Sequence, residues 1–131
     1  MTRRYLLDTH LVLWWVAGNR QLGVATRRLI ETSACSVSVV TLSEIALKVA
    51  AGKLRLPTQP LDAQLAHAGI AVVPLNVAHV HAAARLMGGH PDPFDCLLVG
   101  TALAEKMLFA TRDQPLLERA APLLGKMLVE A

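Results

Sequence analysis

Short, uniformly apolar runs alternate with helical patterns along this chain, and that alternation limits the folds open to it. The strand-like runs cover residues 4–7, 35–40, 70–75 and 108–111, and residues 127–129 suggest a last edge strand. Strands that are apolar throughout are typical of a parallel sheet covered on both faces. We therefore predict an α/β fold of three layers, in which helices flank a central, mainly parallel β-sheet.

The segments between the strand-like runs carry helix signals. Helices are predicted at residues 9–17, 23–32, 42–50, 61–68, 77–87, 93–106 and 115–120. In the third of these, Leu42, Ile45 and Val49 share one helical face. The chain has 131 residues with neither an internal repeat nor a linker, so we expect a single domain over residues 1–131.

Four acidic residues stand where predicted strands end and helices begin, namely Asp8, Glu44, Asp95 and Asp113. Taken singly, each is explained as a helix cap, and Thr41 with Glu44 matches a capping box. The carboxyl ends of parallel strands, however, share one edge of a sheet, where ligands bind in such folds. Taken together, the four acids predict one pocket of carboxylates that binds a divalent cation.

Asp95 is the clearest indication of a cation site. It is the only charged residue between Asp92 and Glu105, in a helix predicted to be largely buried. A buried carboxylate loses solvation and needs a cation or several hydrogen bonds to remain ionised. Carboxylate oxygens suit Mg²⁺ or Mn²⁺. Without a nucleophilic serine or cysteine motif nearby, such a site suggests metal-assisted hydrolysis of a phosphodiester.

The charge balance fits a polyanionic substrate. The formal net charge is +3, and outside the four acids 13 basic residues face six acidic ones. Lys48 and Arg112 are the better candidates for phosphate contacts, because each lies near one of the four acids. Lys48 also follows Glu44 by four residues, which predicts an ion pair along a helix.

Cellular location follows from the cysteines and from the absence of long apolar runs. Cys35 and Cys96 belong to no CxxC pair and are expected to be buried thiols in a reducing compartment. The sequence shows no signal peptide and no run of about 18 apolar residues. We therefore expect a cytoplasmic protein that does not cross a membrane.

Several histidines and tryptophans leave two explanations open. His10 lies two residues after the first of the four acids and either approaches a substrate or packs against its neighbours. Trp14 and Trp15 either stack on bases or continue the apolar face of the first helix. His79 and His81 are two positions apart and face different sides of one helix, which favours surface positions over zinc binding.

Four motifs resemble those of PIN-domain ribonucleases, specifically the VapC-type toxins of bacterial VapBC toxin–antitoxin pairs. They occur in the family's order across residues 6–113. One residue departs from the pattern, because Cys96 stands where members with this motif often have arginine. The matching segments are Leu6-Leu7-Asp8-Thr9-His10 with Leu13-Trp14-Trp15, Ser43-Glu44-Ile45-Ala46-Leu47-Lys48 with Gly52-Lys53-Leu54, Asp92-Pro93-Phe94-Asp95 with Leu97-Leu98, and Ala110-Thr111-Arg112-Asp113.

The resemblance implies a Mg²⁺- or Mn²⁺-dependent endoribonuclease that acts as a toxin. In that family pattern, Asp8 and Asp95 correspond to the firmest metal ligands. Glu44 and Asp113 correspond to further ligands or to groups that position the attacking water. The resemblance also implies a homodimer and inhibition by a VapB-type antitoxin. Residues that would lie beside the site or hydrogen-bond its carboxylates are Asp92, Thr9 and Thr111.

Two other functions compete with the nuclease interpretation. The first is a non-catalytic PIN-like module that keeps the acidic pocket and binds RNA or protein without cutting. The second is a receiver-like phosphotransfer domain, which would need an aspartate at the end of a central strand in mid-chain. The strand end at Pro74-Leu75-Asn76 supplies none, which counts against the second alternative.

Overall fold

The computed structural model describes residues 3–56 and 60–131, and its centre is a five-stranded sheet in the order β3-β2-β1-β4-β5. All four strand pairs are parallel. This confirms the predicted α/β fold with a parallel central sheet. The strands are β1 (Arg4–Leu7), β2 (Ala34–Ser38), β3 (Ala71–Val73), β4 (Leu108–Thr111) and β5 (Leu128–Glu130).

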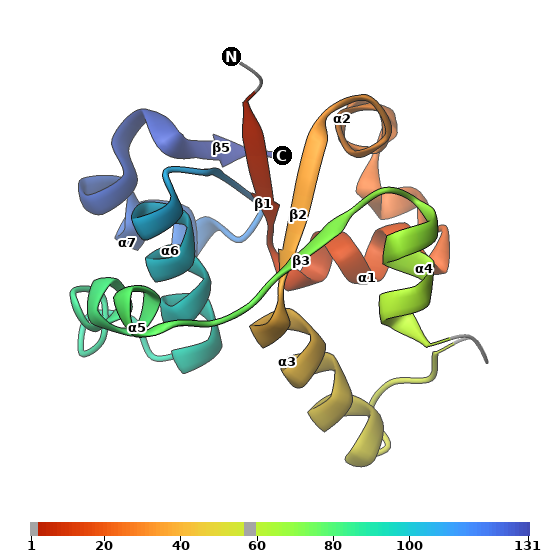
Figure 1. Cartoon of the computed structure of the whole chain (residues 1–131), viewed down its shortest axis with the longest axis horizontal. Coiled ribbons are helices and arrows are strands. Elements are labelled where there is room, and N and C mark those ends of the chain that lie inside the picture. Colours follow the sequence, from red (N-terminus) through yellow and green to blue (C-terminus); the bar gives the residue numbers. More distant parts are fainter. Residues whose placement is uncertain (1–2, 57–59) are drawn as a thin grey trace.

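Helices cover both faces of the sheet. Helices α5, α6 and α7 lie on one side and α1, α2 and α4 on the other (Figure 1). None of the helices in the described part of the chain is long and apolar enough to span a bilayer. The helices are α1 (Thr9–Ala17), α2 (Val24–Thr32), α3 (Val39–Ala50), α4 (Leu61–His67), α5 (Val77–Ala84), α6 (Pro93–Glu105) and α7 (Gln114–Leu124), with 3-10 turns η1 (Arg20–Leu22) and η2 (Gly125–Met127).

Consecutive residues of the central strands point into two separate cores. Leu6 and Phe109 pack with α5, α6 and α7, whereas Leu7 and Ala110 pack with α1, α2 and α4. This is the period-two alternation of a strand with apolar layers on both sides. It explains why β1 and β4 are apolar throughout. Cys35 and Cys96 are buried in opposite cores as free thiols, in agreement with the sequence prediction.

Helices α5 and α6 approach each other so closely that their contact requires a glycine. A Cβ atom at Gly100 of α6 would overlap backbone atoms of Ala83 and His79 in α5. Gly100 itself is buried. The contact fixes α6 in place, and α6 carries Asp95 in its first turn.

Ser38 ends β2 two residues earlier than predicted. Its hydroxyl accepts a hydrogen bond from Val40 N–H at 3.0 Å and caps α3, which begins at Val39. The predicted capping box of Thr41 and Glu44 is therefore wrong, because both residues lie inside the helix. The predicted ion pair is confirmed, with Lys48 Nζ 3.5 Å from Glu44 Oε2.

Other boundaries also differ from those read from the sequence. Helix α7 spans Gln114–Leu124 and continues past the predicted end at residue 120. Helix α5 ends at Ala84, three residues before its predicted end, and β3 is shorter than predicted at both ends. The turn η1 was not predicted. The segment between the helices predicted at 42–50 and 61–68 includes residues 57–59, which lie outside the described residues.

His79 is buried, so its predicted surface position is wrong. Its side chain is 1% exposed. Its Nδ1 accepts a hydrogen bond from Asn76 N–H at 3.2 Å, and its Nε2 lies 2.9 Å from Glu105 Oε1. Because Nδ1 accepts, the proton is on Nε2 and is donated to Glu105. His81 is exposed, as predicted.

Candidate active site

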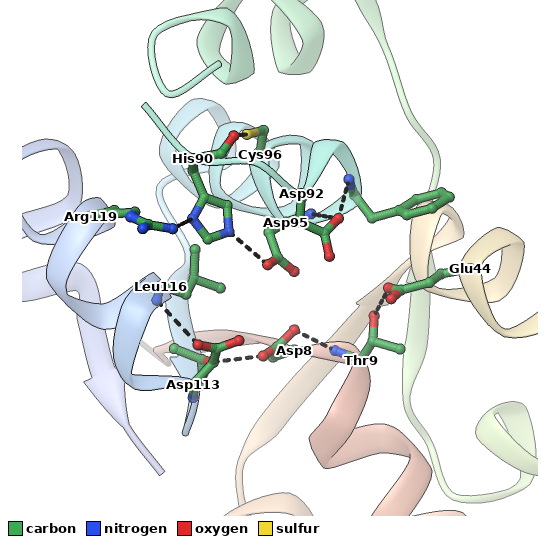
Figure 2. Close-up of polar contacts among 12 residues, drawn as sticks. Asp8, Thr9, Glu44, His90, Asp92, Asp95, Cys96, Asp113, Leu116 and Arg119 are labelled. Atoms are coloured by element: carbon green, nitrogen blue, oxygen red, sulfur yellow. Dashed lines mark hydrogen bonds and ion pairs between the residues drawn. The ribbon is translucent and has the colours of Figure 1, made fainter. Parts of the chain in front are cut away.

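The four acids highlighted in the sequence come from separate elements and face one space at the carboxyl edge of the sheet. Asp8 follows β1, Glu44 lies in α3, Asp95 is in the first turn of α6, and Asp113 follows β4. Figure 2 shows Asp8 and Asp95 facing each other, with Glu44 to one side and Asp113 to the other. The structure thus brings these four side chains to one location.

Asp8 is buried and held by two hydrogen bonds. Its Oδ1 accepts from Thr9 N–H and its Oδ2 accepts from the Thr111 hydroxyl, each at 2.7 Å. Burial raises the pKa of Asp8, while the bonds from Thr111 and Thr9 oppose the rise. Its backbone N–H donates to Ala110 carbonyl oxygen at 2.9 Å, which extends the pairing of β1 with β4. Strand pairing therefore fixes the position of this carboxylate.

Glu44 is fixed by a pair of threonines and by Lys48. The Thr9 hydroxyl donates to Glu44 Oε1 at 2.8 Å. Because that hydroxyl has a single proton, the 3.0 Å contact between Thr9 and Thr41 has Thr41 as its donor. Glu44 Oε2 faces Lys48 at 3.5 Å. Thr9 thus joins the acid of α3 to the helix that follows Asp8.

Asp95 is oriented by two residues that the sequence reasoning missed, His90 and Arg119. His90 Nε2 lies 2.8 Å from Asp95 Oδ2, and His90 Nδ1 lies 3.1 Å from Arg119 Nη1. A guanidinium only donates, so Nδ1 must accept and the proton must sit on Nε2. His90 is therefore neutral and donates to Asp95. No periodicity or motif marks this contact, because Arg119 comes from α7.

The pKa of Asp95 is raised to about 6. The main cause is burial, and the negative charges of Asp8 and Asp92 add to it. The hydrogen bond from His90 acts in the opposite direction. The site therefore crowds negative charge around a carboxylate that is already poorly solvated.

Asp92 and Asp113 act as helix caps, which confirms the capping explanation given for Asp113, and each keeps one oxygen for other partners. Asp92 Oδ1 accepts from Phe94 N–H at 2.9 Å and from Asp95 N–H at 3.3 Å. Asp113 Oδ1 accepts from Leu116 N–H at 3.3 Å. Within the described residues, the Oδ2 atoms of both acids accept no hydrogen bond. Capping and ligand binding are therefore compatible at these two positions.

Arg112 is engaged by the protein backbone. Its guanidinium donates to carbonyl oxygens of Leu22 at 2.5 Å and Ala131 at 2.6 Å, and also to that of Gln21. Its Cζ lies 5.0 Å from the ring centroid of Trp14. These contacts tie η1 and residue 131 to the end of β4. The predicted contact between Arg112 and a phosphate stays a prediction. Of the two predicted phosphate contacts, Lys48 has fewer protein partners that would compete with a phosphate than Arg112 has.

Cys96 points away from the acids. Its side chain is buried, and Sγ lies 3.7 Å from the carbonyl oxygen of His90, to which the thiol donates. Burial raises the pKa of this thiol, and the charge of Asp95 adds to the rise. The residue that departs from the family pattern therefore supports the loop that carries His90.

The donor set suits a hard cation. Among residues 3–56 and 60–131, no group of three or more His, Cys, Asp or Glu side chains lies close enough together to hold a metal ion in this arrangement. The donors are nevertheless carboxylate oxygens, which Mg²⁺ and Mn²⁺ prefer. The repulsion that raises the pKa of Asp95 is also the repulsion that a bound cation would relieve.

Comparison with known proteins gives one family and several related folds. Residues 5–122 match the family model described as PIN domain. No curated protein matches the sequence significantly. A toxin–antitoxin complex from Klebsiella pneumoniae is similar at 13% identity and a TM-score of 0.64, over 96% of this chain and 96% of that one.

Two further solved structures share the fold. VapBC2 from Rickettsia felis, bound to a DNA fragment from its promoter, is 14% identical with a TM-score of 0.61, over 84% of this chain and 87% of that one. FitAcB from Neisseria gonorrhoeae is 21% identical with a TM-score of 0.61, over 88% and 92% of the two chains. At these identities the likeness concerns the fold.

Proposed function

The chain belongs to the PIN domain family, and from that membership we propose that it is an endoribonuclease that depends on Mg²⁺ or Mn²⁺. PIN domains are generally nucleases that use divalent metal ions. The choice of RNA as substrate and of these two ions is the proposal. It is supported by the oxygen-only donor set and by the basic balance outside the site.

The observation that carries the proposal is the crowding of negative charge around Asp95. Burial, together with the charges of Asp8 and Asp92, raises its pKa to about 6. An ionised carboxylate in such surroundings destabilises the folded protein at neutral pH. A divalent cation between the acids would offset this loss of stability, which explains why the carboxylates lie close together.

The acids have unequal roles in this proposal. Asp8 and Asp95 bind the cation, and Glu44 and Asp113 complete the ligand set or position the attacking water. When bound, the cation supplies Lewis-acid stabilisation of the charge that develops on the scissile phosphate. The water oxygen loses a proton and forms a new bond to phosphorus as the bond to the leaving oxygen breaks. The leaving oxygen takes up a proton, and no covalent bond to the protein forms.

Neighbouring residues support these acids. The Thr111 hydroxyl holds Asp8, and the Thr9 hydroxyl holds Glu44. Asp92 caps α6 and adds negative charge beside Asp95. Lys48 pairs with Glu44 at 3.5 Å and is one third exposed, so it can also contact a phosphate of the substrate.

Cleavage of RNA by the purified chain tests the proposal. We expect cleavage with Mg²⁺ or Mn²⁺, loss of activity in EDTA, and loss in the variants Asp8→Asn and Asp95→Asn. Asp62→Asn is the matched control, because Asp62 is exposed on α4 outside the site. Equal cleavage by all four proteins would overturn the assignment. Binding of RNA without cleavage by the unmodified chain would favour the non-catalytic module.

We also propose that the chain acts as the toxin of a toxin–antitoxin pair in the cytoplasm, as a homodimer held in check by a VapB-type antitoxin. The support is that the similar structures from Klebsiella pneumoniae and Rickettsia felis are described as a toxin–antitoxin complex and as VapBC2. Expression of the chain alone should arrest growth, and Asp8→Asn should abolish the arrest. Equal arrest by both proteins would contradict a catalytic toxin.

A further inference from the structure

Two surface hollows adjoin the acids on opposite flanks. The first, here called the lysine hollow, has a volume of about 500 Å³ and is lined by Glu44, Leu47, Lys48, Lys53, Asp92 and Phe94. The second, the aromatic hollow, has a volume of about 320 Å³ and is lined by His10, Trp14, Arg112 and Asp113. Figure 2 shows Glu44 and Asp113 on the two sides of Asp8 and Asp95, so the hollows lead away from the acids in different directions.

The lysine hollow combines positive charge with an aromatic ring. Lys53 is exposed, and the Lys48 ammonium group lies 3.5 Å from Glu44 Oε2. Leu47 is 56% exposed and, with Phe94, gives the hollow an apolar wall. Ammonium groups beside an apolar wall suit a nucleic-acid strand, since phosphates meet charge and sugars or bases meet the wall.

The aromatic hollow has a different character. The rings of His10 and Trp14 are tilted by 53° with centroids 6.3 Å apart, which leaves an open angle between them. His10 is exposed, so its ring is free to contact a ligand. Arg112 supports Trp14 from 5.0 Å and is itself anchored to backbone carbonyls, which makes this wall rigid. Its volume falls in the range of small-ligand sites.

We propose that an RNA single strand crosses the acids with nucleotides in both hollows. The lysine hollow holds the sugar-phosphate backbone on one side of the scissile bond. The aromatic hollow receives one unpaired base on the other side, against His10 and Trp14. This inference rests on the proposed nuclease function and extends it, because it assigns substrate-binding roles to Lys53, His10 and Trp14.

The arrangement has consequences for the class of substrate. A mononucleotide cannot occupy both hollows, so the chain requires nucleotides on each side of the bond that it cuts. A paired base cannot enter the aromatic hollow without leaving its helix, which costs free energy. The expected substrate is therefore an unpaired segment.

Binding of abasic RNA tests the aromatic hollow. The affinity of the Asp8→Asn variant for a short single-stranded RNA is measured with Mg²⁺. The intact RNA is compared with a series of RNAs that each carry one abasic site, at a different position in each. At one position, the abasic site should weaken binding by about fivefold or more. His10→Ala should weaken binding of the intact RNA by about the same factor. His10→Ala combined with the abasic site should weaken binding no more than either change alone. The matched control His81→Ala, exposed on α5, should change nothing.

Salt dependence tests the lysine hollow. Lys53→Gln should lower RNA affinity for every sequence and reduce the slope of log affinity against log salt by about 0.7. Lys106→Gln is the matched control, since Lys106 caps the opposite end of α6, roughly 17 Å along the helix from Asp95. No change of slope with Lys53→Gln would overturn the backbone path.

The outcomes separate this inference from the proposed function. Suppose that the unmodified chain cleaves RNA, and that the effect of His10→Ala on binding is independent of an abasic site at every position. The nuclease function would then stand, and the aromatic hollow would not be a base site. Suppose instead that His10→Ala and one abasic site have coupled effects on binding, but the chain binds RNA without cutting it. The proposed path of the RNA strand would then stand, and the nuclease function would be rejected.

Discussion

Each end of helix α6 carries a carboxylate paired with a histidine from outside the helix, and the two pairs differ in their surroundings. At the C-terminal end His79 Nε2 lies 2.9 Å from Glu105, and at the N-terminal end His90 Nε2 lies 2.8 Å from Asp95. In both pairs Nδ1 accepts a hydrogen bond, from a backbone N–H or from Arg119. The side chain of Glu105 is 36% exposed, whereas that of Asp95 is 13% exposed.

The difference in surroundings shows that the same kind of histidine–carboxylate hydrogen bond has a different role at each end of α6. Glu105 stands at the negative end of the helix dipole, and its bond from His79 ties α5 to α6. Asp95 stands at the positive end, which favours its charge, but it is buried beside Asp8 and Asp92. The first pair stabilises packing, and the second holds a carboxylate at the place where the proposed chemistry occurs.

The largest expected difference between the two ends concerns cleavage. Asp95→Asn should reduce RNA cleavage by more than about 100-fold, because it removes a proposed metal ligand and not merely a residue that supports one. Glu105→Gln keeps the shape at the other end of α6 and should leave cleavage within about twofold. Initial rates of both variants on one RNA check this. Similar losses in both would mean that the two ends do not differ in function.

The histidines should separate metal affinity from stability. His90→Ala should weaken Mn²⁺ binding by about 10–100-fold, because Asp95 loses the group that orients it. His90→Gln offers an N–H for the same bond and should recover part of the affinity. His79→Gln should instead lower stability by about 1–3 kcal/mol and leave Mn²⁺ binding unchanged. Titration calorimetry and thermal unfolding of the three variants provide the measurements.

Asp95 should also make stability depend on pH in a particular direction. The folded chain holds its proton up to about pH 6, whereas an unfolded chain releases it near the ordinary pKa of 3.8. Between these values the folded state binds more protons, so stability falls as pH rises. The difference between the two pKa values corresponds to a loss of about 3 kcal/mol by pH 7, less any screening by solvent.

Asp95→Asn should remove that loss, so the variant should be more stable than the unmodified chain at pH 7 while being inactive. Mn²⁺ should reduce the difference by stabilising only the unmodified chain. Chemical unfolding at several pH values, with and without Mn²⁺, measures this. A variant that is less stable at pH 7 would show that Asp95 contributes more to packing than to charge repulsion.

The smallest expected effect is that of Arg119. Arg119→Gln removes a charge but leaves an N–H that can reach His90 Nδ1, so Mn²⁺ affinity should fall by about threefold at most. Arg119→Leu leaves His90 Nδ1 without its donor, and its loss of Mn²⁺ affinity should lie between the losses of Arg119→Gln and His90→Ala. If both variants matched His90→Ala, Arg119 itself would be essential for holding Asp95.

How much of the site was predictable depends on the kind of contact. Asp8 and Asp113 were predictable because each lies within two residues of the end of an apolar strand, and the carboxyl ends of parallel strands share one edge of the sheet. Glu44 was placed at the site although its predicted capping box is wrong, since Ser38 begins the helix instead. His90 and Arg119 meet only through tertiary packing, across 29 residues, and no local pattern contains that information.

His79 shows the opposite limit. Helical periodicity correctly separates it from His81, but periodicity does not say which face another helix will cover. That face is covered because Gly100 lets α6 approach the backbone of α5. A single glycine, twenty-one residues away in the sequence, thus decides whether a histidine is on the surface or buried.

The close contact at Gly100 also bears on how the molecule opens. With no side chain between them, α5 and α6 cannot separate by small rotamer changes, so they should leave the sheet as one cooperative unit. Amide hydrogens across both helices should then exchange with solvent with one common free energy of opening. The first turn of α6, and Asp95 with it, would share the protection of the whole α5–α6 unit.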